Sequence, residues 1–190
     1  MASATPNSVR FFVALLPPQE LQDPITAIKH DFRQRFGSQA ALQSPPHVTL
    51  QPPFEWPSDQ VDRLGQHLTT FAHRQTPVPI VLEGYNAFPP RVIYVDVHQT
   101  TALMAIQPSL MDYLDVACGI RDRVSPTRPF TPHVTVGFRD LRPACFHQAW
   151  AEYKERPFAA EFVAQTLTLL RHDGQQWHRF ADFELNQPGA

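Results

Sequence analysis

Apolar positions along the chain follow two patterns, one typical of helices and one typical of strands. Between Asp23 and Gly37 apolar residues recur at helical spacing, which predicts a helix with an N-cap at Asp23, Pro24 in its first turn and a C-cap at Gly37. The same spacing predicts helices at 58–71 (with Ser58 as N-cap), 101–117 and 143–153. Runs rich in β-branched and aromatic residues predict strands at 9–16, 48–50, 78–88, 91–97, 158–170 and 177–185, and a short strand within 130–138.

The order of these elements indicates the fold class. Helices alternate with paired strands, and the Asp173-Gly174 turn is typical of a hairpin. This order favours an α+β fold with antiparallel sheets over a parallel, doubly wound sheet. We expect one domain over residues 9–185, preceded by a small polar leader at 1–8 that is disordered.

Composition narrows the function classes. The 190 residues include 20 Pro but only 7 Gly, and no glycine-rich phosphate loop is present. The net charge of −2 argues against a protein that binds long nucleic acids. Two cysteines form no disulfide framework, and the N-terminal apolar run at 11–16 is too short for an export signal or a membrane span. The sequence therefore predicts a cytoplasmic protein with no membrane attachment.

One short motif occurs twice. The segment at 46–50 reads Pro-His-Val-Thr-Leu, and the segment at 132–136 reads Pro-His-Val-Thr-Val. A repeat at this distance indicates two similar lobes arranged around a cleft by duplication. On a strand, the His and Thr of each copy share one face while the apolar residues face the core. Proline cannot donate to a sheet ladder, so we expect each His at the start of a strand or on an edge strand.

The repeat predicts chemistry that a single copy would not. One His-x-Thr on a strand is more often structural than functional, but two copies between proline-rich loops reverse that balance. If the lobes face each other, His47 and His133 can act as general base and general acid, with Thr49 and Thr135 on the phosphate oxygens. A zinc site requires three or four ligands, and neither copy offers a second metal ligand nearby.

These paired His-x-Thr motifs resemble those of the two-histidine (2H) phosphoesterase superfamily, in its RNA 2′,3′-cyclic phosphodiesterase and 2′-5′ RNA ligase-like branch. The resemblance covers most of the chain, from 9 to 185. It implies a bilobal fold with a central cleft, in which His47 and His133 are acid and base and Thr49 and Thr135 bind phosphate. It also implies catalysis without a metal or cofactor.

Arginine and aromatic residues are less specific signals. Related sequences often carry an Arg three positions after the second Thr; here that position is Phe138, and Arg139 follows. On a regular strand Arg139 would point away from the phosphate. Arg91 is a further candidate for the cleft. Arg128 belongs to the stretch 121–142, which holds five Arg and is either a basic patch for the substrate or a solvated surface. Base-stacking candidates are Phe11, Phe54, Tyr85 and Phe130.

The sequence therefore predicts a monomeric enzyme that opens 2′,3′-cyclic phosphates at RNA ends or on small nucleotides and leaves 2′-phosphates. Two alternatives remain open at this point: 2′-5′ RNA ligation, and a module that binds RNA ends or nucleotides without turnover. Neither the physiological substrate nor the identity of the acidic histidine follows from the sequence.

Overall fold

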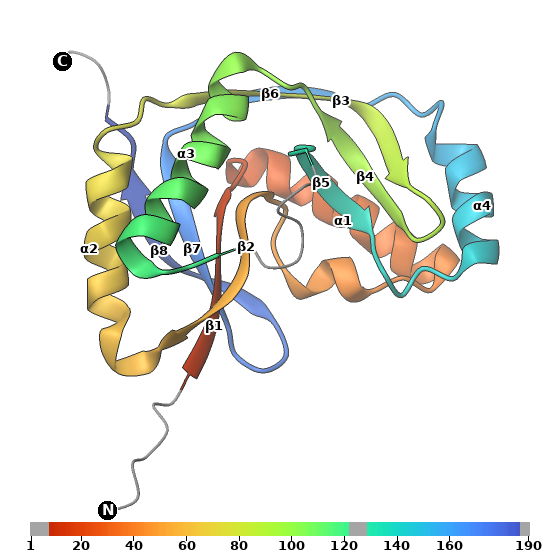
Figure 1. The fold of residues 1–190 in the computed structure, drawn as a ribbon. Helices are drawn as coiled ribbons and strands as arrows, with labels where there is room; N and C mark the ends of the chain where they lie inside the picture. The colour runs from red at the N-terminus through yellow and green to blue at the C-terminus, as the bar shows by residue number, and fades with distance from the viewer. Residues whose placement is uncertain (1–7, 122–128, 187–190) are drawn as a thin grey trace, which may run out of the picture.

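The computed structural model describes residues 8–121 and 129–186. Its described segments form two four-stranded antiparallel sheets (Figure 1). In spatial order, the first sheet contains β2 (Val48–Pro57), β1 (Ser8–Leu15), β7 (Thr166–His172) and β8 (Trp177–Glu184). The second contains β5 (His133–Gly137), β4 (Val92–Val97), β3 (Val78–Phe88) and β6 (Ala159–Ala164). The predicted α+β class is confirmed.

The two halves of the chain exchange strands. In the first half, β1 is followed by a helix and then by the motif strand β2, which pairs with β1 in the first sheet. In the second half, β4 is followed by a helix and then by the motif strand β5, which pairs with β4 in the second sheet. The chain then crosses over, so that β3 joins the second sheet and β7 joins the first. Each motif strand is left at an edge of its sheet. This arrangement gives the two lobes their pseudo-two-fold relation.

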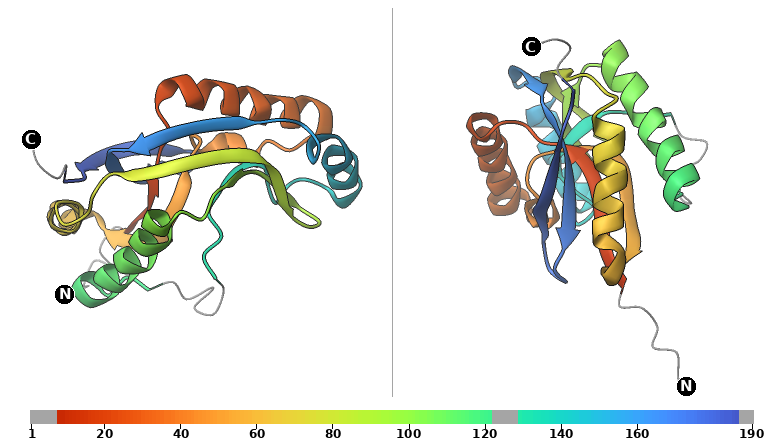
Figure 2. Two further views of the ribbon diagram at one scale, coloured as in Figure 1. Left: turned by 90° about the horizontal axis from the view of Figure 1, so that it is seen from above. Right: turned by 90° about the vertical axis from the view of Figure 1, so that its left-hand side faces the viewer.

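The helices are exchanged in the same way. They are α1 (Gln19–Phe36), α2 (Val61–Ala72), α3 (Thr101–Cys118) and α4 (Pro143–Tyr153). Although α1 follows β1 of the first sheet, it packs with α4 against the second sheet, whereas α3 follows β4 and packs with α2 beside β2. Figure 2 shows α1 on the opposite side of the strands from α2 and α3. The lobes are therefore tied together by both strands and helices.

The predicted start of the first helix is wrong. α1 begins at Gln19, so Pro24 lies inside it, and Asp23 is not its N-cap. The Asp23 carboxylate instead accepts a hydrogen bond from the Gln19 side chain at 2.7 Å. At the other end, Gly37 adopts a left-handed conformation (φ 71°) and ends the helix as predicted.

Two further predicted boundaries need correction. The strand predicted at 48–50 continues to Pro57, because β2 is an edge strand on which prolines cost no ladder hydrogen bonds to an outer neighbour. The single strand predicted at 158–170 is two strands, since the chain passes from the second sheet to the first at Gln165. Ser58 opens a short 3-10 turn and α2 itself begins at Val61, three residues later than predicted.

β1 has two apolar faces. Phe11, Val13 and Leu15 belong to the main core, which both lobes share. Phe12 and Ala14 alternate with them and face the other side of the sheet, where Leu170 and Trp177 pack against them. The apolar run of β1 is continuous because one face of the strand packs in the main core and the other face packs beside the motif strand.

Candidate active site

Both motif histidines lie where the preceding proline predicts. His47 stands directly before β2, His133 is the first residue of β5, and both strands are at sheet edges. The apolar residues of each motif are buried, while the His and Thr side chains are half-buried on the opposite face. The predicted division of each strand into a core face and an open face is confirmed.

Each imidazole is fixed by the same hydrogen bond. His47 Nδ1 lies 2.7 Å from the Pro45 carbonyl, and His133 Nδ1 lies 2.8 Å from the Thr131 carbonyl. A carbonyl oxygen can only accept, so Nδ1 carries the hydrogen in both rings. Nε2 therefore remains in each ring as the nitrogen that can take or give a proton.

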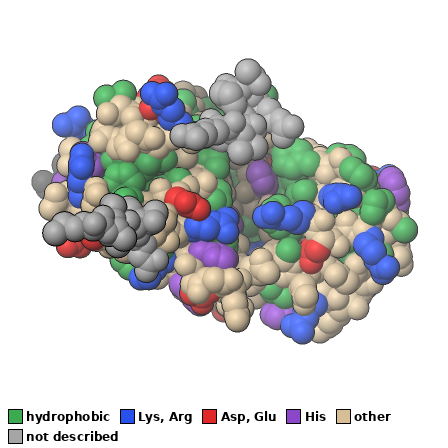
Figure 3. All heavy atoms as spheres, turned by 60° about the horizontal axis from the view of Figure 1, so that its bottom comes forward, with side chains coloured by type: hydrophobic (Ala, Val, Ile, Leu, Met, Phe, Trp, Pro, Cys, Tyr) green, Lys and Arg blue, Asp and Glu red, His purple; other side chains and the backbone are tan. Residues whose placement is uncertain are grey.

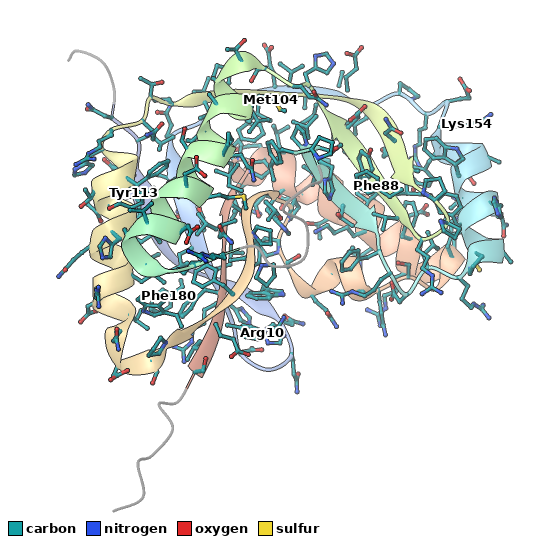
Figure 4. All side chains as sticks on the ribbon, viewed as in Figure 1. Arg10, Phe88, Met104, Tyr113, Lys154 and Phe180 are labelled. Atoms are coloured by element: carbon teal, nitrogen blue, oxygen red, sulfur yellow. The ribbon has the colours of Figure 1, made fainter. Side chains whose placement is uncertain are left out.

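Aromatic side chains from the neighbouring strands hold both rings. The Phe12 ring on β1 lies 4.8 Å from the His47 ring, measured between centroids. The Tyr94 ring on β4 lies 5.0 Å from the His133 ring, and Phe88 lies 5.2 Å from it. Phe88 is at the end of β3 (labelled in Figure 4). These contacts restrict the orientation of rings that a backbone hydrogen bond already anchors.

The two lobes bring all four motif side chains, those of His47, Thr49, His133 and Thr135, into one cavity of about 220 Å³. Residues from five parts of the chain complete its lining. Those residues are Phe12, Ala40, Ala41, Gln43, Ser44, Pro53, Phe138, Arg139 and Trp177. No Asp or Glu is among them, so the cavity offers donors and a cation to an anionic group. Figure 3 shows one face of the molecule on which His and Lys or Arg side chains gather around a recess.

The charges near the two histidines have opposite signs. Burial first, and then the Lys29 ammonium and His133, lower the pKa of His47 to about 3, against the hydrogen bond to Pro45, which raises it. Burial also lowers the pKa of His133, but its hydrogen bond to Thr131 and the Asp96 carboxylate raise it. Asp96 pairs with His133 across β4 and β5. The arrangement therefore favours the proton on His133 over His47.

Arg139 lines the cavity, contrary to the expectation from strand parity. β5 ends at Gly137, so the alternation of a strand no longer applies two residues later. Asp140 fixes this turn by accepting hydrogen bonds from Ser38 Oγ at 2.8 Å and from the backbone of Gln39 and Ala40 at 2.8 and 2.9 Å. The short 3-10 helix η1 (Ala40–Gln43) and the turn that carries Arg139 are thereby tied together as cavity walls.

The other candidates from the sequence that lie in the described residues do not line the cavity. Arg91 is exposed in the turn between β3 and β4, and Arg128 lies outside the described residues. Phe11 and Tyr85 are buried in the core, while Phe54 and Phe130 pack against it. The aromatic residues that do line the cavity are Phe12, Phe138 and Trp177. Phe12 can be identified as a lining residue from the sequence, because alternation along β1 places it on the same side as the half-buried motif residues.

The described segments contain no group of three or more His, Cys, Asp or Glu side chains placed to hold a metal ion. No helix in them is long and apolar enough to cross a membrane.

Two four-stranded sheets that carry paired His-x-Thr strands into one shared cavity define a two-histidine phosphoesterase fold. Comparison with known proteins gives the same assignment: residues 17–176 match the model of the 2'-5' RNA ligase superfamily. The chain belongs to this superfamily.

Individual relatives agree with this assignment. A protein of Bacillus licheniformis named "Putative phosphoesterase" is 32% identical over 67% of this chain and 70% of its own length. A Geobacillus kaustophilus protein with the same designation is 28% identical over 85% of this chain and 87% of its own length. Among solved structures, E. coli LigT complexed with 3'-AMP aligns with a TM-score of 0.69 at 19% identity, covering 95% of this chain and all of LigT. TT0787 of Thermus thermophilus aligns over the same shares with a TM-score of 0.68 at 20% identity. These structural likenesses support the fold.

Proposed function

We propose that this protein is a metal-independent cyclic phosphodiesterase that opens 2′,3′-cyclic phosphates at RNA ends or on small nucleotides and leaves 2′-phosphates. The observation that carries the proposal is the single cavity lined by His47, His133, Thr49 and Thr135. Two imidazoles that each retain a free Nε2 are suited to take a proton at one oxygen and give one at another. That a fold of this kind has been crystallised as LigT with 3'-AMP and with phosphate is consistent with such a substrate.

The charges around the two rings support a division of roles between them. His47, with Lys29 nearby and a pKa of about 3, is neutral at pH 7 and serves as the general base. His133, beside the Asp96 carboxylate, holds a proton more readily and serves as the general acid. A phosphate in the cavity raises the pKa of both rings, which brings them toward the range in which acid–base catalysis is efficient.

The reaction then balances in one displacement. A water molecule attacks phosphorus as His47 Nε2 removes a proton from it, and the bond from phosphorus to O3′ breaks. The Nε2–H of His133 gives its proton to O3′, so the product carries a 3′-hydroxyl and a 2′-phosphate. The hydroxyls of Thr49 and Thr135 donate to the non-bridging oxygens, and exchange with solvent returns His47 and His133 to their starting protonation.

The test is hydrolysis of an oligonucleotide with a 2′,3′-cyclic phosphate end, in the presence of EDTA. We expect the wild type to form 2′-phosphate ends, and His47→Ala and His133→Ala to lose about 10²–10⁴-fold in rate, the usual contribution of a general acid or base. His147→Ala is the matched control, because His147 is exposed on α4 and does not line the cavity.

Other outcomes would contradict the proposal. Near wild-type rates in either cavity variant would remove the histidine from catalysis, and loss of all activity in EDTA would indicate a metal. Accumulation of joined ends would indicate 2′-5′ ligation, and binding without any product would indicate a binding module.

A further inference from the structure

Lys29 is a buried cation that the proposed reaction does not use directly. It lies on the buried face of α1 with Ile25, Phe32 and Phe36, and only 2% of it is exposed. Its Nζ donates one hydrogen bond, of 3.0 Å, to the Ser44 carbonyl. In the described part of the chain no carboxylate forms an ion pair with Lys29. A buried ammonium with one neutral partner is costly, which points to a ligand that supplies the missing charge.

A groove lies beside Lys29. It has a volume of about 270 Å³ and is lined by Lys29 and by residues of α1, of the segment 42–46 and of the β7–β8 turn. Those residues are Gln19, Gln22, Thr26, Leu42, Gln43, Ser44, Pro45, Pro46, Gln176 and Trp177. Besides Lys29, the side chains with hydrogen-bonding groups in this lining are four Gln, Thr26, Ser44 and Trp177, and none of the described lining residues carries a carboxylate.

The groove adjoins the histidine cavity. Gln43, Ser44 and Trp177 line both spaces, so they form a shared wall between them. A ligand whose reacting phosphate lies between the histidines can therefore extend along this wall toward Lys29. Because the groove is polar and contains one buried cation, the extension it suits is a second anion rather than an apolar group.

We propose that the groove binds a second phosphate of the substrate, one nucleotide away from the cyclic phosphate, and that Lys29 is the residue that selects for it. This inference rests on the proposed function and narrows its substrate class to 5′-phosphorylated nucleotides or RNA ends. The pKa of Lys29, which burial lowers to about 7, supports it: an anion in the groove offsets the cost of burial and restores the charged form.

Three substrates test the proposal and separate the two sources of the phosphate. They are adenosine 2′,3′-cyclic phosphate, its 5′-phosphorylated form, and a diadenosine with a cyclic phosphate end. In the wild type we expect kcat/KM to be at least about tenfold higher for one or both phosphate-bearing substrates, the usual effect of a hydrogen bond to a charged group. A preference for the mononucleotide alone identifies a terminal phosphate, and a preference for the dinucleotide identifies the phosphodiester.

The variants are Lys29→Met and, as a control, Lys154→Met, which changes the only other lysine, exposed at the end of α4 (Figure 4). Lys29→Met should remove the preference, measured within each variant as the ratio of kcat/KM for the phosphate-bearing and nucleoside substrates. This ratio is the readout because loss of the ammonium near His47 changes the rate on all three substrates alike. Methionine has nearly the length of lysine, and replacing a poorly paired buried charge is often tolerated. Lys154→Met should keep the wild-type preference.

Equal loss on all three substrates in Lys29→Met would overturn the inference, because it would indicate a structural role through Ser44 and His47. A wild type with equal kcat/KM on all three substrates would also overturn the inference. If Lys29→Met does not fold, 5′-AMP and adenosine are compared as inhibitors of the wild type, and equal inhibition by both has the same meaning. A wild type that opens none of the three substrates contradicts the proposed function itself.

Discussion

The two halves of the cavity hold their histidines by the same means. In each half a proline precedes the His, the ring donates from Nδ1 to the backbone carbonyl two residues earlier, and an aromatic ring of the neighbouring strand packs against it. In each half the Thr follows two residues later on the same face. The geometry of the site is thus duplicated along with the motif.

The surroundings of the two rings differ in charge. Lys29 of α1 lies near His47 and lowers its pKa, while Asp96 of β4 pairs across the ladder with His133 and raises its pKa. Neither charged residue belongs to the repeated motif. The motif therefore fixes where the imidazoles lie, whereas the elements packed against it decide which imidazole carries the proton.

The two halves also differ at the position two residues after each Thr. Gln51 on β2 is buried with an amide oxygen that has no hydrogen-bond partner among the described residues. The equivalent residue on β5 is Gly137, and a Cβ there would lie 2.7 Å from the Phe32 ring of α1. Gly137 therefore permits α1 to pack closely on β5, which brings α1 and its Lys29 toward the cavity.

Of the tests that compare the two halves, we expect the largest effect on activity from removing either of the two Thr hydroxyls. Thr49→Val and Thr135→Val keep the shape of the side chain but remove its donor. If both hydroxyls bind the same phosphate, each variant should lose about 10- to 100-fold in kcat/KM, as for the loss of a hydrogen bond to a charged group. The measurement is steady-state hydrolysis of a cyclic-phosphate oligonucleotide.

Thr→Ser at the same positions provides the control, because serine restores the hydroxyl without the methyl group. Each serine variant should recover most of the lost activity. If one Thr→Val variant were unaffected while the other lost activity, the two halves would not contribute equally to phosphate binding.

The sequence predicted the parts of this site that depend on local patterns. Alternation on a strand placed Val48 and Val134 in the core and the His and Thr on the open face. The proline before each His predicted a position at the start of a strand or on an edge strand, and both motif strands are edge strands. Convergence of the two copies followed from treating the repeat as a duplication.

What the sequence did not reveal depends on contacts between distant segments. Arg139 reaches the cavity because β5 stops at Gly137 and Asp140 binds the segment around Ser38, about 100 residues away. Lys29 occupies a position in the apolar stripe of α1, which was a usable signal, but its approach to His47 depends on how α1 crosses to the other lobe. Strand exchange between lobes has no local signature, so the change of sheet at Gln165 was missed.

A smaller effect, on stability, tests the close packing that distinguishes β5 from β2. Gly137→Ala forces the Phe32 ring or Leu141 to move, and overpacking of this kind costs about 1–3 kcal/mol in the free energy of unfolding. Gly65→Ala on α2 is the matched control, since its Cβ would meet only the Phe183 ring at 3.9 Å and alanine favours a helix. Denaturant unfolding measures both. Equal stability of the two variants would contradict the proposed role of Gly137.

The smallest effect we expect concerns the charge beside His133. Asp96→Asn removes the carboxylate that favours the imidazolium, so the pKa of His133 falls. In a bell-shaped profile of kcat/KM the acid must be protonated, so its pKa sets the alkaline limb, and this limb should move to lower pH by less than about one unit. The acidic limb, which His47 sets, should not move. At pH 8 the variant should be slower by at most about tenfold, and at pH 5 it should match the wild type.

The control for this profile is Asp112→Asn, which changes an acidic residue of α3 that does not line the cavity. Asparagine at 96 retains an oxygen for the backbone hydrogen bond that Asp96 accepts from Val97 at 3.0 Å. Besides the charge, it loses the exposed 3.3 Å hydrogen bond that the other carboxylate oxygen accepts from Asn86 Nδ2. If Asp96→Asn shifted the acidic limb instead, the assignment of base and acid to His47 and His133 would be reversed. If neither limb moved, the charge asymmetry between the two halves would have no part in catalysis.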